Sequence, residues 1–406
     1  MPVQLPSQGK PRSFGVNMAS SQREVLQSSK LQEMIETVIK NENFIHHHIH
    51  IKTIKVKNSY VGVYRQINIR GESKTGKKEL HLFTKTMPHK DYVETKGFDE
   101  MFSITDAYSK EAFMYSEFSK TINEVQEEVS IPVRERYTLA KSYASTDSDT
   151  IIFENLTTKG FEMYPPQEVI TLKFAELAIK SLAKFHSFAF ILKEKRIKFF
   201  EDLVKIMKQP FFYDTKSYNK NLETKSQIGI NCLNPELRKR MQEYVLTTFD
   251  KYLKYIQDPK DTWTLVHGDY KTSNIMVQLK DGDVFNVMPV DYQLSFYGCP
   301  ILDLMLFMFS CTDQEFRKNH MEYLKNLYYT SMQQFLSLFN MDVENYYPRA
   351  EFERIYKERF DLGLTLALFM LPIQFNEDDA STSNQNHVLC ERVRGVVDDY
   401  IQWGYI

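Results

Sequence analysis

The feature that most constrains the fold is a change in the hydrophobic pattern near residue 155. Before it, apolar and polar residues alternate with the period of β-strands over residues 45–56, 60–69 and 79–87. Weaker patterns predict a helix over 24–38, a helix over 106–120, and strands over 136–142 and 150–154. After it, helical periodicity dominates over 171–190, 236–256, 314–339 and 351–371, with a strand-rich interval at 264–290.

This change divides the chain into two parts of different class. We predict an α+β protein with a small β-rich N-terminal lobe over residues 21–155 and a large, mostly helical C-terminal lobe over residues 156–406. Residues 1–20 are polar and without periodicity, which is typical of a mobile arm.

Composition and charge narrow the function classes. The chain has 406 residues, is 42% hydrophobic and carries a formal net charge of -2, so it has no general attraction to nucleic acid or to anionic membranes. The N-terminal region lacks the apolar run of a signal peptide. The apolar stretch at 362–371 is shorter than the roughly 20 residues that span a bilayer. We therefore expect a soluble, cytoplasmic protein without membrane insertion.

The cysteines do not form a recognisable set. Cys232, Cys299, Cys311 and Cys390 contain no C-x-x-C pair, and their spacing indicates neither a disulfide framework nor a zinc site. We expect unpaired thiols in a reducing interior.

The clearest chemical motif is His267-Gly268-Asp269-Tyr270-Lys271-Thr272-Ser273-Asn274, followed by a strand that ends at Asp291. Phosphoryl transfer depends on positioning, and these residue types supply it. Asp269 suits a base that accepts the proton of an attacking hydroxyl, while Asn274 and Asp291 offer the oxygen ligands that Mg²⁺ prefers. The alternative is an ordinary loop, since Gly, Asp and Asn are common in turns and helix caps. The second Asp after the next strand favours the catalytic interpretation.

Two charged residues occupy faces that are otherwise apolar. Lys85 shares its strand face with Phe83 and Met87, and Glu111 lies within the apolar stripe of the helix predicted over 106–120. Buried charges are costly unless paired, so we predict that Lys85 and Glu111 pair with each other. A kinase uses such a pair to contact the α and β phosphates of a nucleotide. Alternatively, Lys85 extends to solvent and Glu111 lies at an edge.

Two further segments are weaker candidates for nucleotide binding. Residues 151–156 end the first lobe, so Glu154 and Leu156 lie where a linker can offer backbone groups to an adenine. An ordinary strand that runs into a loop explains this segment equally well. A loop over residues 57–62 lies between two predicted strands and contains Ser59, which is suited to present N–H groups to phosphates.

Several histidines and one aspartate are better explained as structural. Residues 46–50 contain four histidines, but on a strand His47 points away from the other three, which favours an exposed face over a metal site. His186 lies on an apolar helix face and is expected to be buried and hydrogen-bonded. His267 and Asp303 are expected to support the loop around Asp269 without taking part in the chemistry.

Taken together, these segments resemble the insect ecdysteroid kinase-like family, which belongs with the aminoglycoside phosphotransferases and choline kinases. The matching stretches are residues 83–88, 110–115, 153–156 with Gly160 and Phe161, 181–186, 267–274 and 290–300 with Asp303. They occur in the family's order and span roughly residues 40 to 400. Three departures are present: Asn155 replaces the usual Asp, Cys299 replaces a small Ser or Asp, and the loop at 57–62 is poor in Gly.

The resemblance implies a two-lobed protein-kinase-like fold, ATP as phosphoryl donor, Mg²⁺ as cofactor and a hydroxyl of a small molecule as acceptor. An ecdysteroid or a plant or xenobiotic compound in detoxification is the implied substrate. Only twelve positions separate Asp291 from Asp303, which leaves little room for the activation loop of a protein kinase. Aromatic residues Phe211, Phe212, Tyr213 and Tyr218 are candidates for lining an acceptor pocket, although core packing explains each of them equally well.

Two alternatives stay open at this point. One is a choline- or sugar-type kinase with a polar acceptor. The other is a catalytically silent relative that carries a nucleotide or a hormone, which would have no need for all of Lys85, Glu111, Asp269, Asn274 and Asp291.

Overall fold

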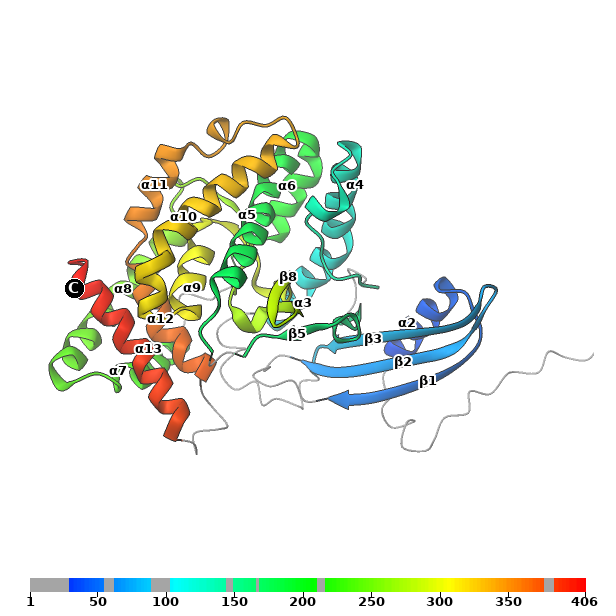
Figure 1. The fold of residues 1–406 in the computed structure, drawn as a ribbon, viewed down its shortest axis with the longest axis horizontal. Helices are drawn as coiled ribbons and strands as arrows, with labels where there is room; N and C mark the ends of the chain where they lie inside the picture. Colours follow the sequence, from blue (N-terminus) through cyan, green and yellow to red (C-terminus); the bar gives the residue numbers. More distant parts are fainter. Residues whose placement is uncertain are drawn as a thin grey trace, which may run out of the picture.

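The structure of the protein is a computed structural model, and it describes residues 29–54, 62–88, 103–143, 149–165, 168–209, 216–375 and 383–406. The arm predicted over residues 1–20 lies outside this described part. Figure 1 shows a curved sheet on one side of the molecule and a bundle of helices on the other. The chain is thus a mixed α and β protein of the predicted class.

The sheet has four antiparallel strands in the order β1-β2-β3-β4. Its strands are β1 (Phe44–Ile54), β2 (Val63–Ser73), β3 (Gly76–Thr86) and β4 (Thr150–Glu154). One face packs on helix α2 (Ser29–Asn41), where Leu31 and Ile35 meet Ile67 and Leu82 in a core of their own. The structure thus confirms the strands predicted over 45–56, 60–69, 79–87 and 150–154 to within a few residues.

The helix predicted over residues 106–120 is the central part of a longer helical run. It consists of α3 (Ile104–Phe113), a π-helical turn η1 (Met114–Phe118) and α4 (Ser119–Glu128). The apolar side chains of this run belong to the main core of the helical part; the ring centroids of Phe118 and Phe185, for example, lie 6.1 Å apart. These helices therefore connect the sheet to the helical bundle (Figure 1).

The strand predicted over residues 136–142 is wrong. A side chain occupies the backbone at its start, because Tyr137 donates its N–H to Gln126 Oε1 at 2.8 Å and its carbonyl accepts from Gln126 Nε2 at 3.1 Å. Within this segment a single bridge joins Ser142 to Phe153 of β4. Alternating hydrophobicity does not reveal such a competitor for backbone hydrogen bonds.

The remaining helices form the larger part of the molecule. They are α5 (Leu172–Lys195), α6 (Ile197–Ile206), α7 (Lys216–Ile230), α8 (Pro235–Gln257), α9 (Ile301–Cys311), α10 (Gln314–Ser337), α11 (Arg349–Glu358), α12 (Leu362–Phe375) and α13 (Ser383–Gln402). Every residue of α9 is buried, which explains its largely apolar sequence. The helix predicted over 351–371 is two helices, α11 and α12. The C-cap of α11 is Arg359, whose guanidinium pairs with Asp258 at 2.7 Å and with Asp261 at 2.8 Å.

Two small sheets lie between the helices and carry the segments that the sequence marked for chemistry. One consists of β5 (Phe161–Met163), β7 (Ile275–Lys280) and β8 (Asp283–Pro289). The other pairs β6 (Thr264–Val266) with β9 (Phe296–Gly298). Because β6 precedes the loop at 267–274 and β9 follows Asp291, this pairing brings both segments to one place.

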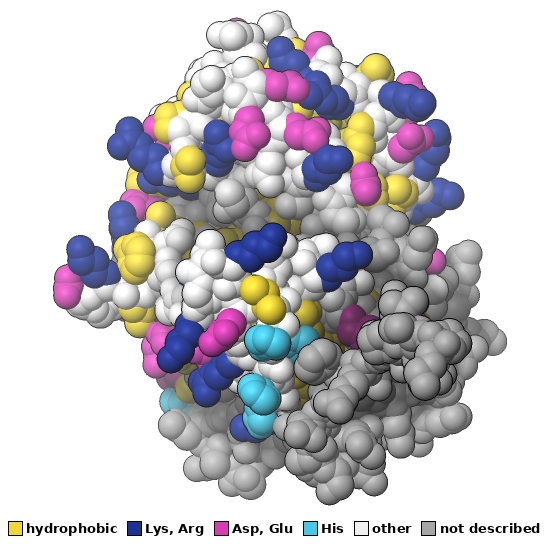
Figure 2. All heavy atoms as spheres, turned by 90° about the vertical axis from the view of Figure 1, so that its right-hand side faces the viewer, with side chains coloured by type: hydrophobic (Ala, Val, Ile, Leu, Met, Phe, Trp, Pro, Cys, Tyr) yellow, Lys and Arg dark blue, Asp and Glu magenta, His cyan; other side chains and the backbone are white. Residues whose placement is uncertain are grey.

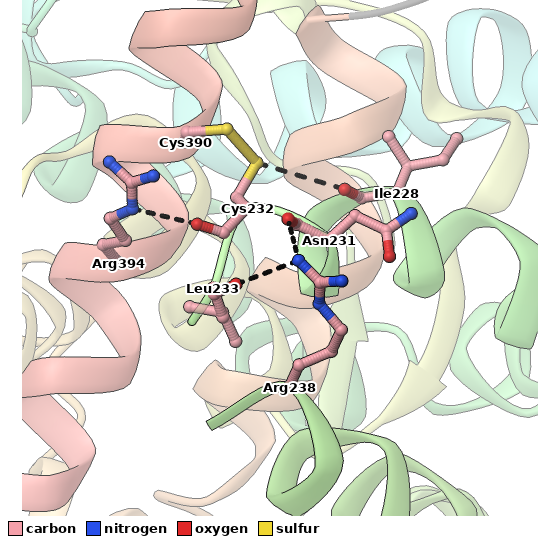
Figure 3. The surroundings of a disulfide bond; sticks show 7 residues. All are labelled: Ile228, Asn231, Cys232, Leu233, Arg238, Cys390 and Arg394. Atoms are coloured by element: carbon pink, nitrogen blue, oxygen red, sulfur yellow. Dashed lines mark hydrogen bonds between the residues drawn. A yellow bond between two sulfur atoms is a disulfide. The ribbon is translucent and has the colours of Figure 1, made fainter. Parts of the chain in front are cut away.

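A disulfide corrects the expectation that all four cysteines stay unpaired. Cys232, in the turn before α8, is bonded to Cys390 of α13, and the two residues are 158 positions apart in the chain (Figure 3). Arg394, one turn further along α13, donates to the carbonyl of Cys232 at 2.9 Å. Cys299 and Cys311 are free and buried. No spacing rule links cysteines so far apart, which is why the sequence did not show the pair.

Crossing a bilayer requires a helix that is both long and strongly apolar. Among the described residues, none of them meets both requirements.

We expect replacement of Cys390 by Ser to lower the free energy of unfolding by about 2–4 kcal/mol, since a cross-link over a long stretch restricts the unfolded chain. Urea unfolding without reductant would measure the loss. As a control, dithiothreitol should bring the unmodified protein to the midpoint of the variant. Equal midpoints without reductant would show that Cys232 and Cys390 are not joined in the protein.

Candidate active site

The loop at residues 267–274 is held by a buried carboxylate from α9. Asp303 accepts hydrogen bonds from the backbone N–H of His267 at 2.7 Å and of Gly268 at 3.0 Å. Gly268 has a φ of +83°, and a Cβ there would come within 2.3 Å of the carbonyl oxygen of Leu294. Glycine is therefore required at this turn, which directs the next residue, Asp269, out of the core.

Two buried histidines surround the same carboxylate. His186 of α5 lies with Nε2 at 3.0 Å from Asp303 and with Nδ1 at 2.7 Å from the Tyr328 hydroxyl. His267 is fully buried and contacts the Val290 carbonyl through Nε2 at 3.2 Å. Burial lowers the pKa of His267 below its usual value, against the pull of Asp303. A neutral His267 thus joins the loop to the segment that leads to Asp291.

Asp269 is held by two groups of its own loop. Asn274 donates its amide N–H to Asp269 Oδ2 at 2.8 Å and to the Asp269 carbonyl at 2.9 Å. Lys271 lies with Nζ at 2.8 Å from Oδ1 and 2.9 Å from Oδ2 of the same carboxylate. With the nitrogen of its amide directed to Asp269, Asn274 has its amide oxygen available on the other side.

Asp291 follows β8 in an unusual backbone conformation. Its φ is +69°, in the left-handed region that only a few residue types adopt readily, Asp among them. The turn is fixed on both sides: Val290 donates its N–H to the Asn274 carbonyl at 2.9 Å, and Asp291 donates its own N–H to the Tyr115 hydroxyl at 3.3 Å. Observed strain of this kind is concentrated at functional sites.

The predicted pair of inward charges is present and includes a third member. Lys85 of β3 donates to Glu111 of α3 at 2.6 Å, to Asp291 at 2.8 Å and to the amide oxygen of Gln293 at 2.9 Å. Burial would lower the pKa of Lys85, but the carboxylates of Asp291 and Glu111 outweigh it and raise this pKa well above the usual value. Burial also raises the pKa of Glu111 to about 7, with Lys85 opposing it. Lys85 is therefore a permanent cation.

The segment that leaves the sheet contains Glu154 and Leu156. Glu154 Oε1 accepts from the Lys141 N–H at 3.1 Å, its other oxygen pairs with Lys159, and Leu156 is buried. Between them, Asn155 caps the short helix η3 (Leu156–Lys159) by accepting from Thr157 N–H at 3.2 Å. The amide oxygen of Asn155 performs this capping role as a carboxylate would, so the departure at this position leaves the local geometry intact.

Some predicted residues fall outside the described part of the chain, and some residues of the observed site were not predicted from the sequence. Ser59 of the proposed phosphate loop and the aromatic residues 211–213 lie outside it, and the Tyr218 side chain is likewise not described. The sequence reading gave no role to Gln293, Lys271 or Tyr115. All three lie within the stretches that carried the family resemblance, which was the available signal.

The four histidines of β1 lie apart from this site. His46, His48 and His50 are exposed and His47 is half-buried. Figure 2 shows histidine side chains gathered in one area of the surface formed by the sheet. Among the described residues, no three His, Cys, Asp or Glu side chains are grouped as a metal cluster.

The match to a family model identifies the chain as a small-molecule kinase. More specifically, the chain belongs to the ecdysteroid kinase-like family, whose model matches residues 57–341. No curated protein matches the sequence.

Solved structures of distant proteins resemble the chain. An ethanolamine kinase of Plasmodium vivax has a TM-score of 0.40 and 10% identity, covering 85% of this chain and 82% of its own. The GDP complex of wild-type aminoglycoside 2′-phosphotransferase-IIIa has a TM-score of 0.36 and 11% identity, covering 92% of this chain and 100% of its own. At these scores the similarities say nothing about the activity of this chain.

We expect Lys85→Met to lower the free energy of unfolding by about 3–5 kcal/mol at pH 8, because it leaves Glu111 buried beside Asp291 without a counter-ion. The loss should shrink toward pH 5. A carboxyl whose pKa is raised in the folded state destabilises the folded protein above that pKa. This destabilisation disappears as the pH falls toward the pKa that the carboxyl has in the unfolded chain. Urea unfolding at pH 5, 6.5 and 8 would measure this trend.

The control is the double variant Lys85→Met/Glu111→Gln, in which the added pH dependence should disappear because no carboxyl titrates at residue 111. A stability loss in Lys85→Met that is the same at pH 5 and pH 8 would contradict the assignment of Glu111 as the group that Lys85 neutralises.

Proposed function

We propose that the protein is an ATP-dependent phosphotransferase that phosphorylates a hydroxyl of a small, lipophilic molecule, either an ecdysteroid or a detoxification substrate. The observation that carries the proposal is the convergence of Lys85 from the sheet with Asp291, 2.8 Å apart, beside the loop that presents Asp269. In this proposal residues 21–155 form the nucleotide-binding lobe and residues 156–406 the catalytic and acceptor-binding lobe.

The nucleotide would lie between the sheet and the helical part. Lys85, fixed by Glu111, is a permanent cation at the place where the α and β phosphates are expected. Glu154 and Leu156 at the end of β4 would offer backbone groups to the adenine, and Ser59 would contribute an N–H to the phosphates. When the phosphates bind Lys85, they replace part of its pairing with Asp291, which frees that carboxylate.

Asn274 and Asp291 fit a magnesium ion by the chemistry of their donors. Both offer hard oxygen atoms, and Mg²⁺ in nucleotide sites takes only one or two protein carboxylates. The amide nitrogen of Asn274 is held by Asp269, so its amide oxygen is the atom left for a metal. When bound, the ion neutralises charge on the nucleotide phosphates.

Asp269 is the proposed general base. Its carboxylate is oriented by Asn274 and Lys271 and is 14% exposed, so a bound acceptor can reach it. The acceptor hydroxyl would donate its proton to Asp269 as its oxygen forms a bond to the γ phosphorus, while the bond from that phosphorus to the ADP oxygen breaks and ADP leaves with the electron pair. His267 and Asp303 act through the loop, because they hold its backbone and lie behind the reacting atoms.

The location of the protein stays a prediction. A cytoplasmic site was expected from the sequence, but the disulfide between Cys232 and Cys390 weighs against it, because such bonds persist mainly in oxidising compartments.

The central test is Asp269→Asn. We expect phosphoryl transfer to fall by roughly 10²–10⁴-fold, since asparagine retains the shape but accepts no proton. Binding of MgATP should be nearly unchanged. The assay would measure ATP consumption, with ecdysteroids, plant glycosides and choline as acceptors, and the mass gain of one phosphoryl group on each.

Asp281→Asn is the matched control for this variant. Asp281 is exposed in the turn between β7 and β8, and its φ of +55° suits asparagine. This control should retain full transfer. Full transfer by Asp269→Asn would contradict the assignment of the base, and transfer to choline alone would replace the lipophilic acceptor with a polar one.

The magnesium assignment is tested by Asp291→Asn, which tolerates the left-handed backbone but lacks the charge. We expect MgATP affinity to fall at least about tenfold, since even groups behind a metal ligand contribute 10–100-fold. Calorimetry with magnesium and with EDTA would measure this. The unmodified protein should bind ATP more tightly with magnesium; equal binding in both buffers would contradict a metal role for Asp291.

A further inference from the structure

Tyr115 follows Glu111 by four residues, and both side chains reach the segment that carries Asp291. Glu111 does so through Lys85, whose Nζ lies 2.6 Å from Glu111 and 2.8 Å from Asp291. Tyr115 does so directly, because its hydroxyl accepts the backbone N–H of Asp291 at 3.3 Å. One helical segment therefore holds Asp291 in two ways, by its side chain and by its backbone.

The Tyr115 hydroxyl is fixed in place by the packing of its ring. The ring lies edge-on against Phe153 of β4, with centroids 4.6 Å apart, and against Tyr292 at 5.5 Å. Tyr115 belongs to the π-helical turn η1, a distortion of helices that is frequent at functional sites. Burial raises the pKa of Tyr115 well above its usual value, so the hydroxyl stays neutral.

This backbone contact differs from the other contact of Asp291 in what a nucleotide does to it. The Asp291 carboxylate lies 2.8 Å from Lys85 Nζ and 3.4 Å from the amide nitrogen of Gln293. In the proposed function, phosphates replace part of the pairing with Lys85. The hydrogen bond to Tyr115 involves neither Lys85 nor the carboxylate, so it persists when the nucleotide binds.

The backbone of Asp291 needs such a contact. A φ of +69° is uncommon for a residue other than glycine, and a conformation of this kind persists only where its surroundings hold it. Val290 supplies one contact, since its N–H is bonded to the Asn274 carbonyl at 2.9 Å. Tyr115 supplies the contact at Asp291 itself.

We propose that Tyr115 is a positioning residue that orients Asp291 for magnesium, an inference that rests on the proposed function. By accepting the N–H of Asp291, the hydroxyl holds the left-handed backbone and so fixes the direction in which the carboxylate leaves the chain. The carboxylate keeps this direction when Lys85 turns to the phosphates. Residues that orient a metal ligand contribute to metal affinity without touching the metal.

A general effect on packing makes a different prediction, and Tyr137 offers a matched control for it. Tyr137 is similarly buried, and its ring packs against Phe185 with centroids 5.7 Å apart. Its hydroxyl lies 2.5 Å from the hydroxyl of Tyr292, the residue after Asp291. Tyr137→Phe therefore removes a buried, hydrogen-bonded hydroxyl of the same aromatic cluster and leaves the bond between Tyr115 and Asp291 in place.

The test measures how far magnesium tightens the binding of ATP. Calorimetry would give the ATP affinity of the full chain in magnesium and in EDTA. In the unmodified protein and in Tyr137→Phe, magnesium should tighten binding to the same extent. In Tyr115→Phe the affinity in EDTA should be unchanged, because Lys85 and Glu111 are intact. The tightening by magnesium should fall about tenfold, the lower end of the range for groups that orient a metal ligand.

A double variant shows whether Tyr115 acts through Asp291. In Asp291→Asn the carboxylate that Tyr115 is proposed to orient is absent, so adding Tyr115→Phe should cause no further loss of MgATP affinity. Residues that act as a unit give non-additive effects of this kind. A residue with an independent role would add its own loss to that of Asp291→Asn.

The outcomes separate this inference from the proposed function. Equal tightening in Tyr115→Phe and the unmodified protein would overturn the role of Tyr115, and so would equal losses in Tyr115→Phe and Tyr137→Phe. A further loss in the double variant would also overturn it. ATP binding without any tightening by magnesium in the unmodified protein would remove the metal role of Asp291 and the inference with it. Failure of the unmodified protein to bind ATP would overturn the proposed function itself.

Discussion

The buried ammonium of Lys85 is the interaction on which the arrangement of the molecule depends. It lies on β3 and reaches Glu111 on α3 and Asp291 after β8, so it ties together three segments that are distant in the chain. An unpaired charge at this depth would cost several kcal/mol, so the pairing of Lys85 with the two carboxylates favours the arrangement in which they meet. This pairing therefore favours the observed position of the sheet against the helical part.

The position of the Asp269 loop depends on a second polar centre. Asp303 accepts from two successive backbone N–H groups, and Gly268 turns the chain where no side chain fits. Because Asp303 belongs to α9, which is buried along its whole length, the loop inherits the rigidity of the main core. His186 completes the centre from α5. The apolar helices thus contribute to the site through a small number of buried polar groups.

The sequence predicted those features whose signal is local. An inward lysine on a strand and an inward glutamate on a helix identified the Lys85–Glu111 pair, since each is visible from the periodicity of its own segment. Features that depend on distant partners were not predictable. The disulfide at Cys390 joins residues far apart in the chain, and Arg359 at the end of α11 pairs with residues that precede β6. The false strand at 136–142 has the same cause, because Gln126 competes for its backbone.

The two halves of the proposed site also differ in what orients them. Asp269 is held by Lys271 and Asn274, which are two and five residues further along the same loop, so its geometry is local. Lys85 and Asp291 are 206 positions apart and meet only when the sheet is closed against the helices. An opening motion between these parts would break the second contact and leave the first intact. In the proposed site, Asp269 is therefore oriented by its own loop, whereas the contact between Lys85 and Asp291 depends on how the sheet packs against the helical part.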